Sequence, residues 1–390
     1  MKRLSTAVFA CLFLVACGGS AAAPAQVSLP AQVSRPAAAT NQSDSWQQLV
    51  QAAQREGTVS LYGPPGGNYR NALIGPFEQA YPGIKVDAYF GDDQSLVSRI
   101  TTERAAHKYL ADVLVDGTTS PITALKQSGA VAPIRPVLML PEVLDESAWL
   151  QQKLWFPDAA EPYVDLQFEG LVSAPIAYNS KLVDPKQFTS QWDILDPKWK
   201  GKIVATDIRR PGTGAAQARY IYKSSDLGPT FLTRLYGETN LKLSSDQRQM
   251  IDWLAQGQYA VSIFVSGTEI VKAKATGLPV DVVPAEQLKE KPPVTSGWGS
   301  VAILDSPPHP NAAKLYINWL LSKQGQLAWQ RETGEPSLRM DIPKDGIDFS
   351  PKAGVEYVNA QTEEYGRITS SVLEPLLTGA LEKAGQASPK

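Results

Sequence analysis

A strand, a turn and a helix start in the middle of the chain carry residue types that could bind an anion. The β-branched run Lys202–Thr206 predicts the strand, Arg209 and Arg210 lie in the turn, and small residues begin a helix at Thr213. The first N–H groups of a helix lack partners and its dipole is positive there, and arginine adds charged donors. We therefore expect an oxyanion site at this turn. A surface turn with two solvated arginines is the alternative.

Three further turns have the same form, with glycines, hydroxyls or tyrosines at the end of an expected strand. These strands are Thr58–Tyr62, Ala111–Val115 and Tyr259–Val265. Ligands of parallel α/β sheets lie beyond the carboxyl ends of the strands, so the turns could converge on one site. Helix capping is the alternative role of the hydroxyls, and an edge position that of the tyrosines. The candidates at these turns are Tyr62, Gly66, Gly67, Tyr69, Thr118, Thr119, Ser120, Ser266, Gly267 and Thr268, and Tyr178 and Thr213 are further candidate ligand-binding residues.

Two other features bear on such a site. Trp298 stands between two glycines and could form a wall of the site or belong to the core. Asp92 and Asp93 follow the second expected strand and favour a cationic ligand, although a solvated helix start explains them equally well.

The elements that must position these residues alternate between strand and helix. The first third of the folded part reads β-α-β-α-β-α, which predicts an α/β fold with a mostly parallel sheet covered by helices on both faces. A chain of 390 residues is too long for one ordinary core, so two lobes are expected.

The N-terminus has the features of an export signal. Lys2 and Arg3 precede the apolar run Leu4–Ala16, which is too short to span a bilayer. The run ends in Leu-Val-Ala followed by Cys17, which resembles the lipobox of bacterial lipoproteins. The resemblance implies a signal peptide over 1–16, a lipid on Cys17 that holds the protein at the membrane, and an exported location. Residues 17–43, rich in Ala, Pro, Ser and Gln, are expected to be a disordered tether.

Composition argues against several classes of function. A net charge of −2 lacks the basic footprint of a nucleic-acid binder. Only two histidines occur, His107 and His309, and the sequence has no Gly-x-Ser-x-Gly elbow, zinc motif or phosphate-binding Gly-Lys-Ser/Thr. We therefore expect no enzymatic activity, no cofactor and no metal centre.

Several segments together resemble one family, the iron(III)-type group of extracellular solute-binding proteins. These proteins are the receptors of ATP-binding-cassette importers. The resemblance covers roughly residues 44–343 and is most specific in its last segment. The segments are Ile176–Asn179, Trp192–Ile203, Gln256–Val261, Gly299–Leu304 and His309–Gln326.

The resemblance implies a two-lobed fold of the periplasmic-binding-protein type II (Venus flytrap) class, with a ligand cleft between the lobes. Lobe 1 would hold residues 44–172 plus 297–390, and lobe 2 would hold residues 173–296, with two strands crossing between them. The expected function is that of a monomer on the periplasmic or extracytoplasmic face, which captures a small molecule and delivers it to the permease.

One departure from the family bears on the ligand. Iron-binding members carry two adjacent tyrosines after the strand that corresponds to Tyr259–Val265, whereas this chain has Ser266, Gly267 and Thr268 there. Small hydroxyls and glycines suit an oxyanion better than ferric iron, so we expect an oxyanionic ligand. A ferric-iron receptor that uses scattered phenolates is the alternative. The tyrosines available for it are Tyr62, Tyr69, Tyr178, Tyr220 and Tyr222.

Overall fold

The computed structural model describes residues 37–209, 213–383 and 385, with side chains from Asp44 onward except that of Thr213. The expected signal peptide, Cys17 and Arg210 lie outside the described residues. Helix α1 spans Ala37–Glu56, so it begins before the expected end of the tether at residue 43. Residues 44–390 form one compact unit.

The first sheet follows the strand order β2-β1-β3-β13-β4, and β5 also pairs with β13. Strands β1, β2 and β3 are parallel, and β13 returns antiparallel to β3. This sheet and its helices are the first lobe. The strands are β1 (Thr58–Gly63), β2 (Lys85–Phe90), β3 (Val113–Asp116), β4 (Val131–Ala132), β5 (Asp165–Gln167) and β13 (Ser300–Leu304).

Helices of the first lobe come from both ends of its sequence. Three fully buried aromatic side chains, Phe77, Trp319 and Trp329, lie in its core, which joins α3, α10 and α11. Burying each such ring contributes a few kcal/mol. The helices are α2 (Gly67–Leu73), α3 (Gly75–Ala80), α4 (Asp93–Ala105), α5 (Pro141–Leu144), α10 (Pro310–Leu321) and α11 (Lys323–Thr333).

The second sheet follows the order β11-β7-β10-β8-β9 and has a separate core. The second lobe consists of this sheet and the helices packed on it. Its strands are β7 (Ile176–Asn179), β8 (Ile203–Thr206), β9 (Lys242–Ser244), β10 (Val261–Ile263) and β11 (Val280–Val282). Its helices are α6 (Thr213–Lys223), α7 (Gly228–Glu238), α8 (Gln247–Ala255) and α9 (Gly267–Ala275).

A small sheet joins the lobes. Strands β6 (Leu171–Val172) and β12 (Pro293–Thr295) are antiparallel, and β14 (Val358–Asn359) lies parallel to β12. Two crossing strands were expected, and the described chain adds this third one. Strands β6 and β7 follow each other closely and are separated at Pro175, which has no N–H to donate to a ladder.

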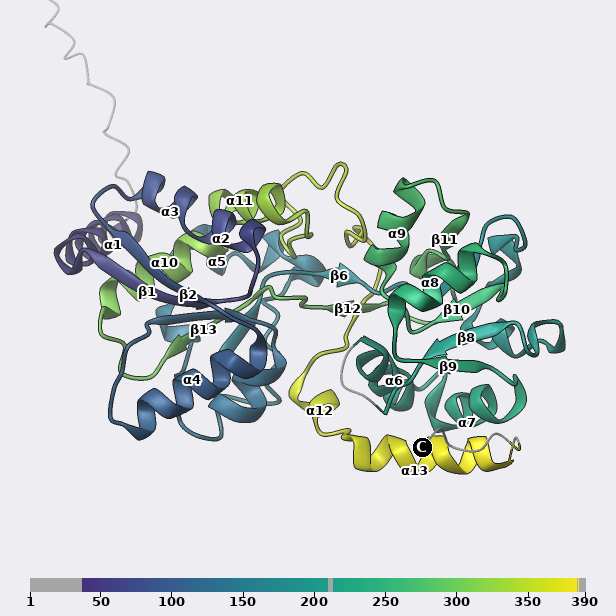
Figure 1. Ribbon diagram of the computed structural model, residues 1–390. Coiled ribbons are helices and arrows are strands. Elements are labelled where there is room, and N and C mark those ends of the chain that lie inside the picture. Colours follow the sequence, from purple (N-terminus) through teal and green to yellow (C-terminus); the bar gives the residue numbers. More distant parts are fainter. Residues whose placement is uncertain (1–36, 210–212, 384, 386–390) are drawn as a thin grey trace, which may run out of the picture. The chain divides into compact units, whose positions relative to one another are not determined.

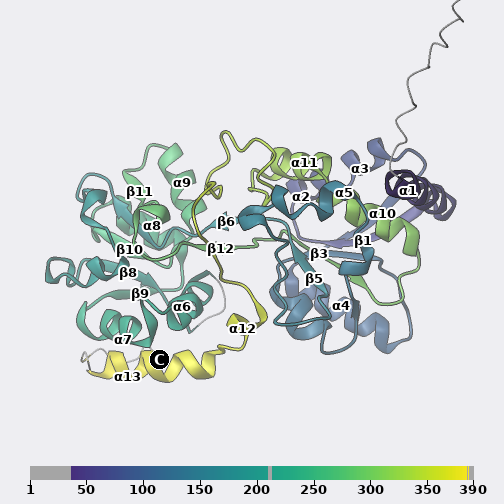
Figure 2. The ribbon, with the colours of Figure 1, turned by 180° about the vertical axis from the view of Figure 1, so that it is seen from behind.

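The C-terminal helices α12 (Glu363–Gly366) and α13 (Ser370–Lys383) belong to the second lobe, because α13 packs on α7 (Figures 1 and 2). Leu373, Leu377 and Leu381 enter the second core. The sequence-based assignment of 297–390 to lobe 1 differs here. The apolar face of α13 is short, and its partner lies far away in the sequence.

The α/β fold and the order of strands and helices agree with expectation. Each turn that was predicted to carry ligands does follow a strand: β1, β3, β8 or β10. No helix within the described residues is long and apolar enough to cross a membrane.

Candidate ligand-binding cleft

A cavity of about 550 Å³ is lined by residues of both lobes and of the small joining sheet. We call it the cleft. Its size suits a small organic ligand. The first lobe contributes Asp93, Asp116, Gly117 and Thr119. The second lobe contributes Ala216, Gln217, Arg219, Ser266, Gly267 and Thr268. The remainder is formed by Leu171, Val172, Ser173, Ala174, Thr295, Gly297, Trp298, Phe349 and Gln361.

Six residues singled out from the sequence line this cleft: Asp93, Thr119, Ser266, Gly267, Thr268 and Trp298. Ser266 occupies the N-cap of α9 but makes no side-chain cap bond. Its hydroxyl instead lies 2.8 Å from that of Thr268, and its N–H donates to Gln247 at 3.0 Å. The second lobe therefore presents two linked hydroxyls at a helix N-terminus.

The tyrosines of the first turn bond within the first lobe. The hydroxyl of Tyr62 donates to Glu103 at 2.7 Å, and that of Tyr69 donates to Glu335 at 2.8 Å. Gly66 and Gly67 begin α2 and are not among the cleft residues.

Thr118 and Ser120, beside the lining residue Thr119, are buried. The Thr118 hydroxyl donates to the carbonyl of Gln361 at 2.8 Å. The side chain of Gln361 in turn accepts from the N–H of Ser296 at 2.6 Å. Thr118 thus helps to position Gln361, which lines the cleft, but is not itself a lining residue.

Arg209 lies against an acid of its own turn. Its Nε and Nη2 donate to the two oxygens of Asp207 at 2.8 and 2.7 Å, so the pair is bidentate. Neither side chain is among the cleft residues. Thr213 is the first residue of α6, whose later residues do reach the cleft.

Arg219, which the sequence reasoning did not single out, is the arginine that lines the cleft. Among the described residues no side chain or carbonyl bonds to its guanidinium, and burial lowers its pKa. It stays charged, because an arginine pKa lies far above neutrality. One signal could have found it: no acid stands three or four residues away on its helix, where a pairing partner would lie.

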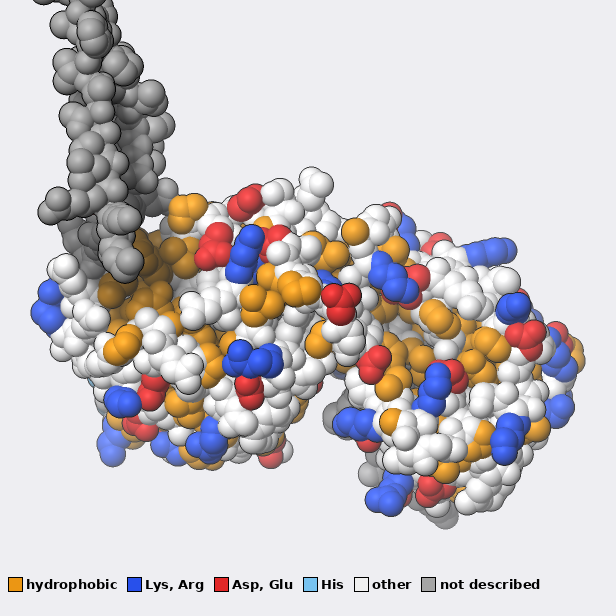
Figure 3. Space-filling model, turned by 90° about the horizontal axis from the view of Figure 1, so that it is seen from above, with side chains coloured by type: hydrophobic (Ala, Val, Ile, Leu, Met, Phe, Trp, Pro, Cys, Tyr) orange, Lys and Arg blue, Asp and Glu red, His pale blue; other side chains and the backbone are white. Residues whose placement is uncertain are grey.

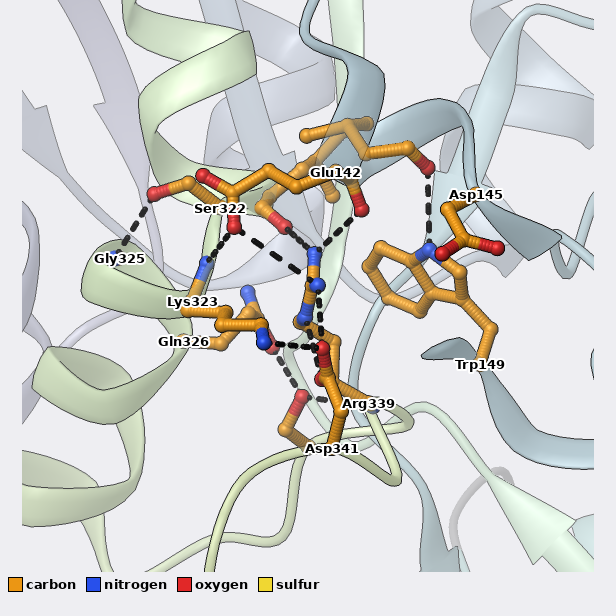
Figure 4. A network of polar contacts seen from close by, with 12 residues as sticks. Glu142, Asp145, Trp149, Ser322, Lys323, Gly325, Gln326, Arg339 and Asp341 are labelled. Atoms are coloured by element: carbon orange, nitrogen blue, oxygen red, sulfur yellow. Dashed lines mark hydrogen bonds and ion pairs between the residues drawn. The ribbon is translucent and has the colours of Figure 1, made fainter. Parts of the chain in front are cut away.

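The chain also shows what a buried arginine looks like when it has its partners. Arg339 is fully buried and forms two 2.9 Å bonds to Asp341, and it donates to the carbonyls of Glu142 and Leu321 (Figure 4). Trp149 lies beside its guanidinium, 5.2 Å from the ring centroid. Arg219 has no such set of partners among the residues that the structure describes.

Two carboxyl groups lie on the first-lobe side of the cleft. Asp116 is fully buried; its Oδ1 accepts from the N–H of Gly117 at 2.8 Å, and its Oδ2 has no hydrogen-bond partner among the described residues. Burial, together with the neighbouring Asp93, raises the pKa of Asp116 from 3.8 to about 8. Asp92 caps α4 through the N–H of Ser95 at 2.8 Å. Asp93 was flagged from the sequence, whereas Asp116 was missed.

A second cavity, of about 1020 Å³, is lined by α9, β11 and residues 344–352. Phe349 lines both cavities, and Tyr178 lines this larger one. Its lysines have partners: Lys274 lies 2.7 Å from Asp281, and Lys352 lies 3.5 Å from Glu286. Although larger, this cavity offers less to a charged ligand than the cleft does.

The described residues contain no group of three His, Cys, Asp or Glu side chains that could hold a metal ion. Burial raises the pKa of Tyr62 to about 12 and also raises the pKa values of Tyr69, Tyr178 and Tyr220. Each of these phenols is therefore harder to ionise than usual, which disfavours the phenolate that ferric iron needs.

The face seen in Figure 3 carries basic and acidic side chains interspersed with apolar ones. Such a surface exerts no strong field of one sign on an approaching solute. Selectivity for a ligand therefore depends on the groups inside the cleft.

The family model of bacterial extracellular solute-binding proteins matches residues 39–327. The chain therefore belongs to this family, and the expected family and two-lobed fold are confirmed. It is a solute-binding protein of the kind that serves ATP-binding-cassette importers.

Among curated proteins, Iron uptake protein A1 of Synechocystis is 27% identical over 149 residues, 37% of this chain. The match spans only 36% of that relative. Among solved structures, iron-bound HitA from Pseudomonas aeruginosa is 20% identical with a TM-score of 0.56, over 83% of this chain and 99% of HitA. AfuA from Actinobacillus pleuropneumoniae, with exogenous fructose-6-phosphate bound, is 18% identical with a TM-score of 0.55, over 85% and 99%. At these identities the structures show a shared fold.

Proposed function

We propose that this protein captures a small organic anion in the cleft and delivers it to the permease of an ATP-binding-cassette importer. The observation that carries the proposal is Arg219, a cationic cleft residue with no bonding partner among the described residues. Leaving a charge partly desolvated and unpaired is unfavourable, and a bound anion would remove that cost.

The second lobe adds neutral donors on the same side. The hydroxyls of Ser266 and Thr268 stand at the N-terminus of α9, where backbone N–H groups and the helix dipole favour negative charge. We therefore propose Arg219 as the anion-binding arginine in place of Arg209; Arg210 lies outside the described residues. Arg209 has a carboxylate partner in Asp207.

The setting of this activity follows the sequence-based predictions. We propose that a lipid on Cys17 holds the protein on the extracytoplasmic face of a membrane, where it acts as a monomer. A receptor of this kind releases its ligand unchanged, so no catalysis is expected. Mass spectrometry of the membrane-extracted protein would test the lipid, since the proposal requires a diacyl or triacyl mass on the peptide that begins at Cys17.

The binding proposal is tested by thermal unfolding against phosphate, phosphonates, small carboxylates, amino acids, polyamines and ferric citrate. A ligand at about 100 times its Kd stabilises the fold by about 2.7 kcal/mol. We expect a shift with one anion class in the wild type, loss of that shift in Arg219→Gln, and its retention in Arg209→Gln. If Arg219→Gln kept full affinity, the assignment of the anion site would be wrong.

A ferric-iron receptor is the second candidate, because the curated relative is named for iron uptake and HitA was solved with iron bound. Iron held by phenolates gives a visible charge-transfer band, whereas an organic anion gives none. A coloured complex that survives Arg219→Gln and is lost with substitution of the tyrosines would establish this candidate and exclude the first.

A further inference from the structure

We propose that the solute of the cleft is a polyhydroxylated anion, a sugar phosphate or sugar acid, whose anionic group pairs with Arg219 and whose hydroxyls bond to Asp116 and Asp93. The inference rests on the proposed function and deepens it, because it assigns the opposite wall of the same cleft.

The two charged walls come from different lobes. Arg219 lies on α6 of the second lobe, whereas Asp116 ends β3 and Asp93 begins α4 of the first lobe. A bare oxyanion such as phosphate would satisfy Arg219 but would leave Oδ2 of Asp116 without a hydrogen-bond partner. A longer ligand supplies that partner if its anionic end faces Arg219 and a hydrogen-bonding end faces the acids.

One carboxyl oxygen of Asp116 has no hydrogen-bond partner among the described residues. Its side chain is fully buried, and its Oδ2 accepts no hydrogen bond from the described residues. Buried polar atoms without partners are rare and costly, so a ligand group that donates to Oδ2 would be favoured. A hydroxyl can do so and can also accept a hydrogen bond from a neighbouring donor.

The state of Asp116 supports a hydroxyl over an ammonium group at this oxygen. Because the pKa of Asp116 is raised to about 8, this carboxyl is protonated at neutral pH, and a protonated acid both donates and accepts. A hydroxyl matches that mixed character. An ammonium group, which only donates, would first have to displace the proton.

The rest of the lining suits a polyol. Seven lining residues have neutral hydrogen-bonding side chains, among them Thr119, Thr268 and Gln217, while Trp298 and Phe349 offer aromatic surface on which the C–H groups of a sugar ring could lie. The cavity volume of about 550 Å³ accommodates a hexose bearing one charged group.

The test is isothermal titration of the wild-type protein with six probes. These are a hexose phosphate, a sugar acid, inorganic phosphate, acetate, glucose and glycine. We expect the hexose phosphate or the sugar acid to bind at least 10-fold more tightly than inorganic phosphate and acetate, and the better of the two identifies the anionic group. In Asp116→Ala, which removes both the donor and the acceptor of this carboxyl group, we expect the hydroxylated anion to lose about 10-fold in affinity, the scale of one hydrogen bond, while inorganic phosphate and acetate are unaffected.

The alternative outcomes are distinguishable. Equal affinity for the hydroxylated anions and their simple counterparts would overturn this inference and leave the proposed anion receptor intact. Tightest binding of glycine would overturn it in favour of an ammonium ligand. Binding of none of the anions, or of ferric iron alone, would overturn both proposals. If Asp116→Ala does not fold, Asp93→Ala provides the same comparison, because Asp93 is half-buried at the start of a helix.

Discussion

At the scale of single residues, the same side chain has opposite roles in the two lobes. Arg339 is surrounded by acceptors, and its charge is part of the first-lobe core. Arg219 has none among the described residues and faces the cleft. A buried arginine stabilises the fold only when its N–H groups donate hydrogen bonds. Substitution of these two residues should therefore change the free energy of unfolding in opposite ways.

We expect Arg339→Met to lower the free energy of unfolding by about 3–5 kcal/mol, because it leaves the Asp341 carboxylate and two carbonyls without their donor. Arg219→Met should leave stability unchanged or raise it, while abolishing anion binding. Urea unfolding of both variants checks this. Equal destabilisation would mean that Arg219 has a structural partner after all.

Asp116 should make stability depend on pH. The unfolded chain releases the proton of this carboxyl near pH 4, but the folded chain keeps it up to about pH 8. The stability that this proton contributes is fully present below pH 4 and is lost as pH rises to 8. Asp116→Asn removes the effect, so the stability of the variant relative to the wild type should rise from pH 4 to pH 8.

Urea midpoints measured across that range test the Asp116 prediction. Asp165 and Glu169 also have raised pKa values; Glu169 is not coupled to Asp116 and cancels in the difference, whereas the Asp116 charge contributes to the raised pKa of Asp165, so the difference includes that coupling. Asp345→Asn, at an exposed carboxyl, is the matched control and should run parallel to the wild type. A parallel curve for Asp116→Asn would contradict the burial of its proton.

At the scale of elements, α13 provides a large part of the cover of α7. Leu377 is fully buried in the second-lobe core, whereas Val372 on the same helix is 38% exposed. We expect Leu377→Ala to lower the free energy of unfolding by about 2–5 kcal/mol and Val372→Ala to change it by less than about 1 kcal/mol. Similar values for the two, in chemical denaturation, would mean that α13 does not stabilise the second lobe.

The elements were largely predictable from the sequence, because strand and helix patterns are local. The sequence predicted anion-binding arginines in the turn after β8, and of these the structure describes Arg209. Asp207 stands two residues before Arg209 and takes up its guanidinium, so the more conspicuous arginine is the less available one. Arg219 and Asp116 gained their importance from packing between distant segments, which a single sequence does not display.

At the scale of the whole molecule, the joining region tolerates little added volume. A Cβ on Gly299 would lie 2.1 Å from the Cβ of Glu169, which is itself fully buried. We expect Gly299→Ala to cost about 1–3 kcal/mol or more, because the neighbouring backbone must shift. Gly75→Ala, where a Cβ meets nothing within 4 Å, should be neutral or stabilising. Thermal unfolding of both variants measures the difference.

The third crossing at β14 has a practical consequence. Leu49 and Ala53 of α1 pack in the core of the first lobe, whereas α13 packs in the second. A fluorescent donor on the exposed face of α1 and an acceptor on α13 would therefore be attached to different lobes. If binding of a solute brings the two lobes closer together, the efficiency of energy transfer between the dyes would change. That change would measure the fraction of the protein that has solute bound.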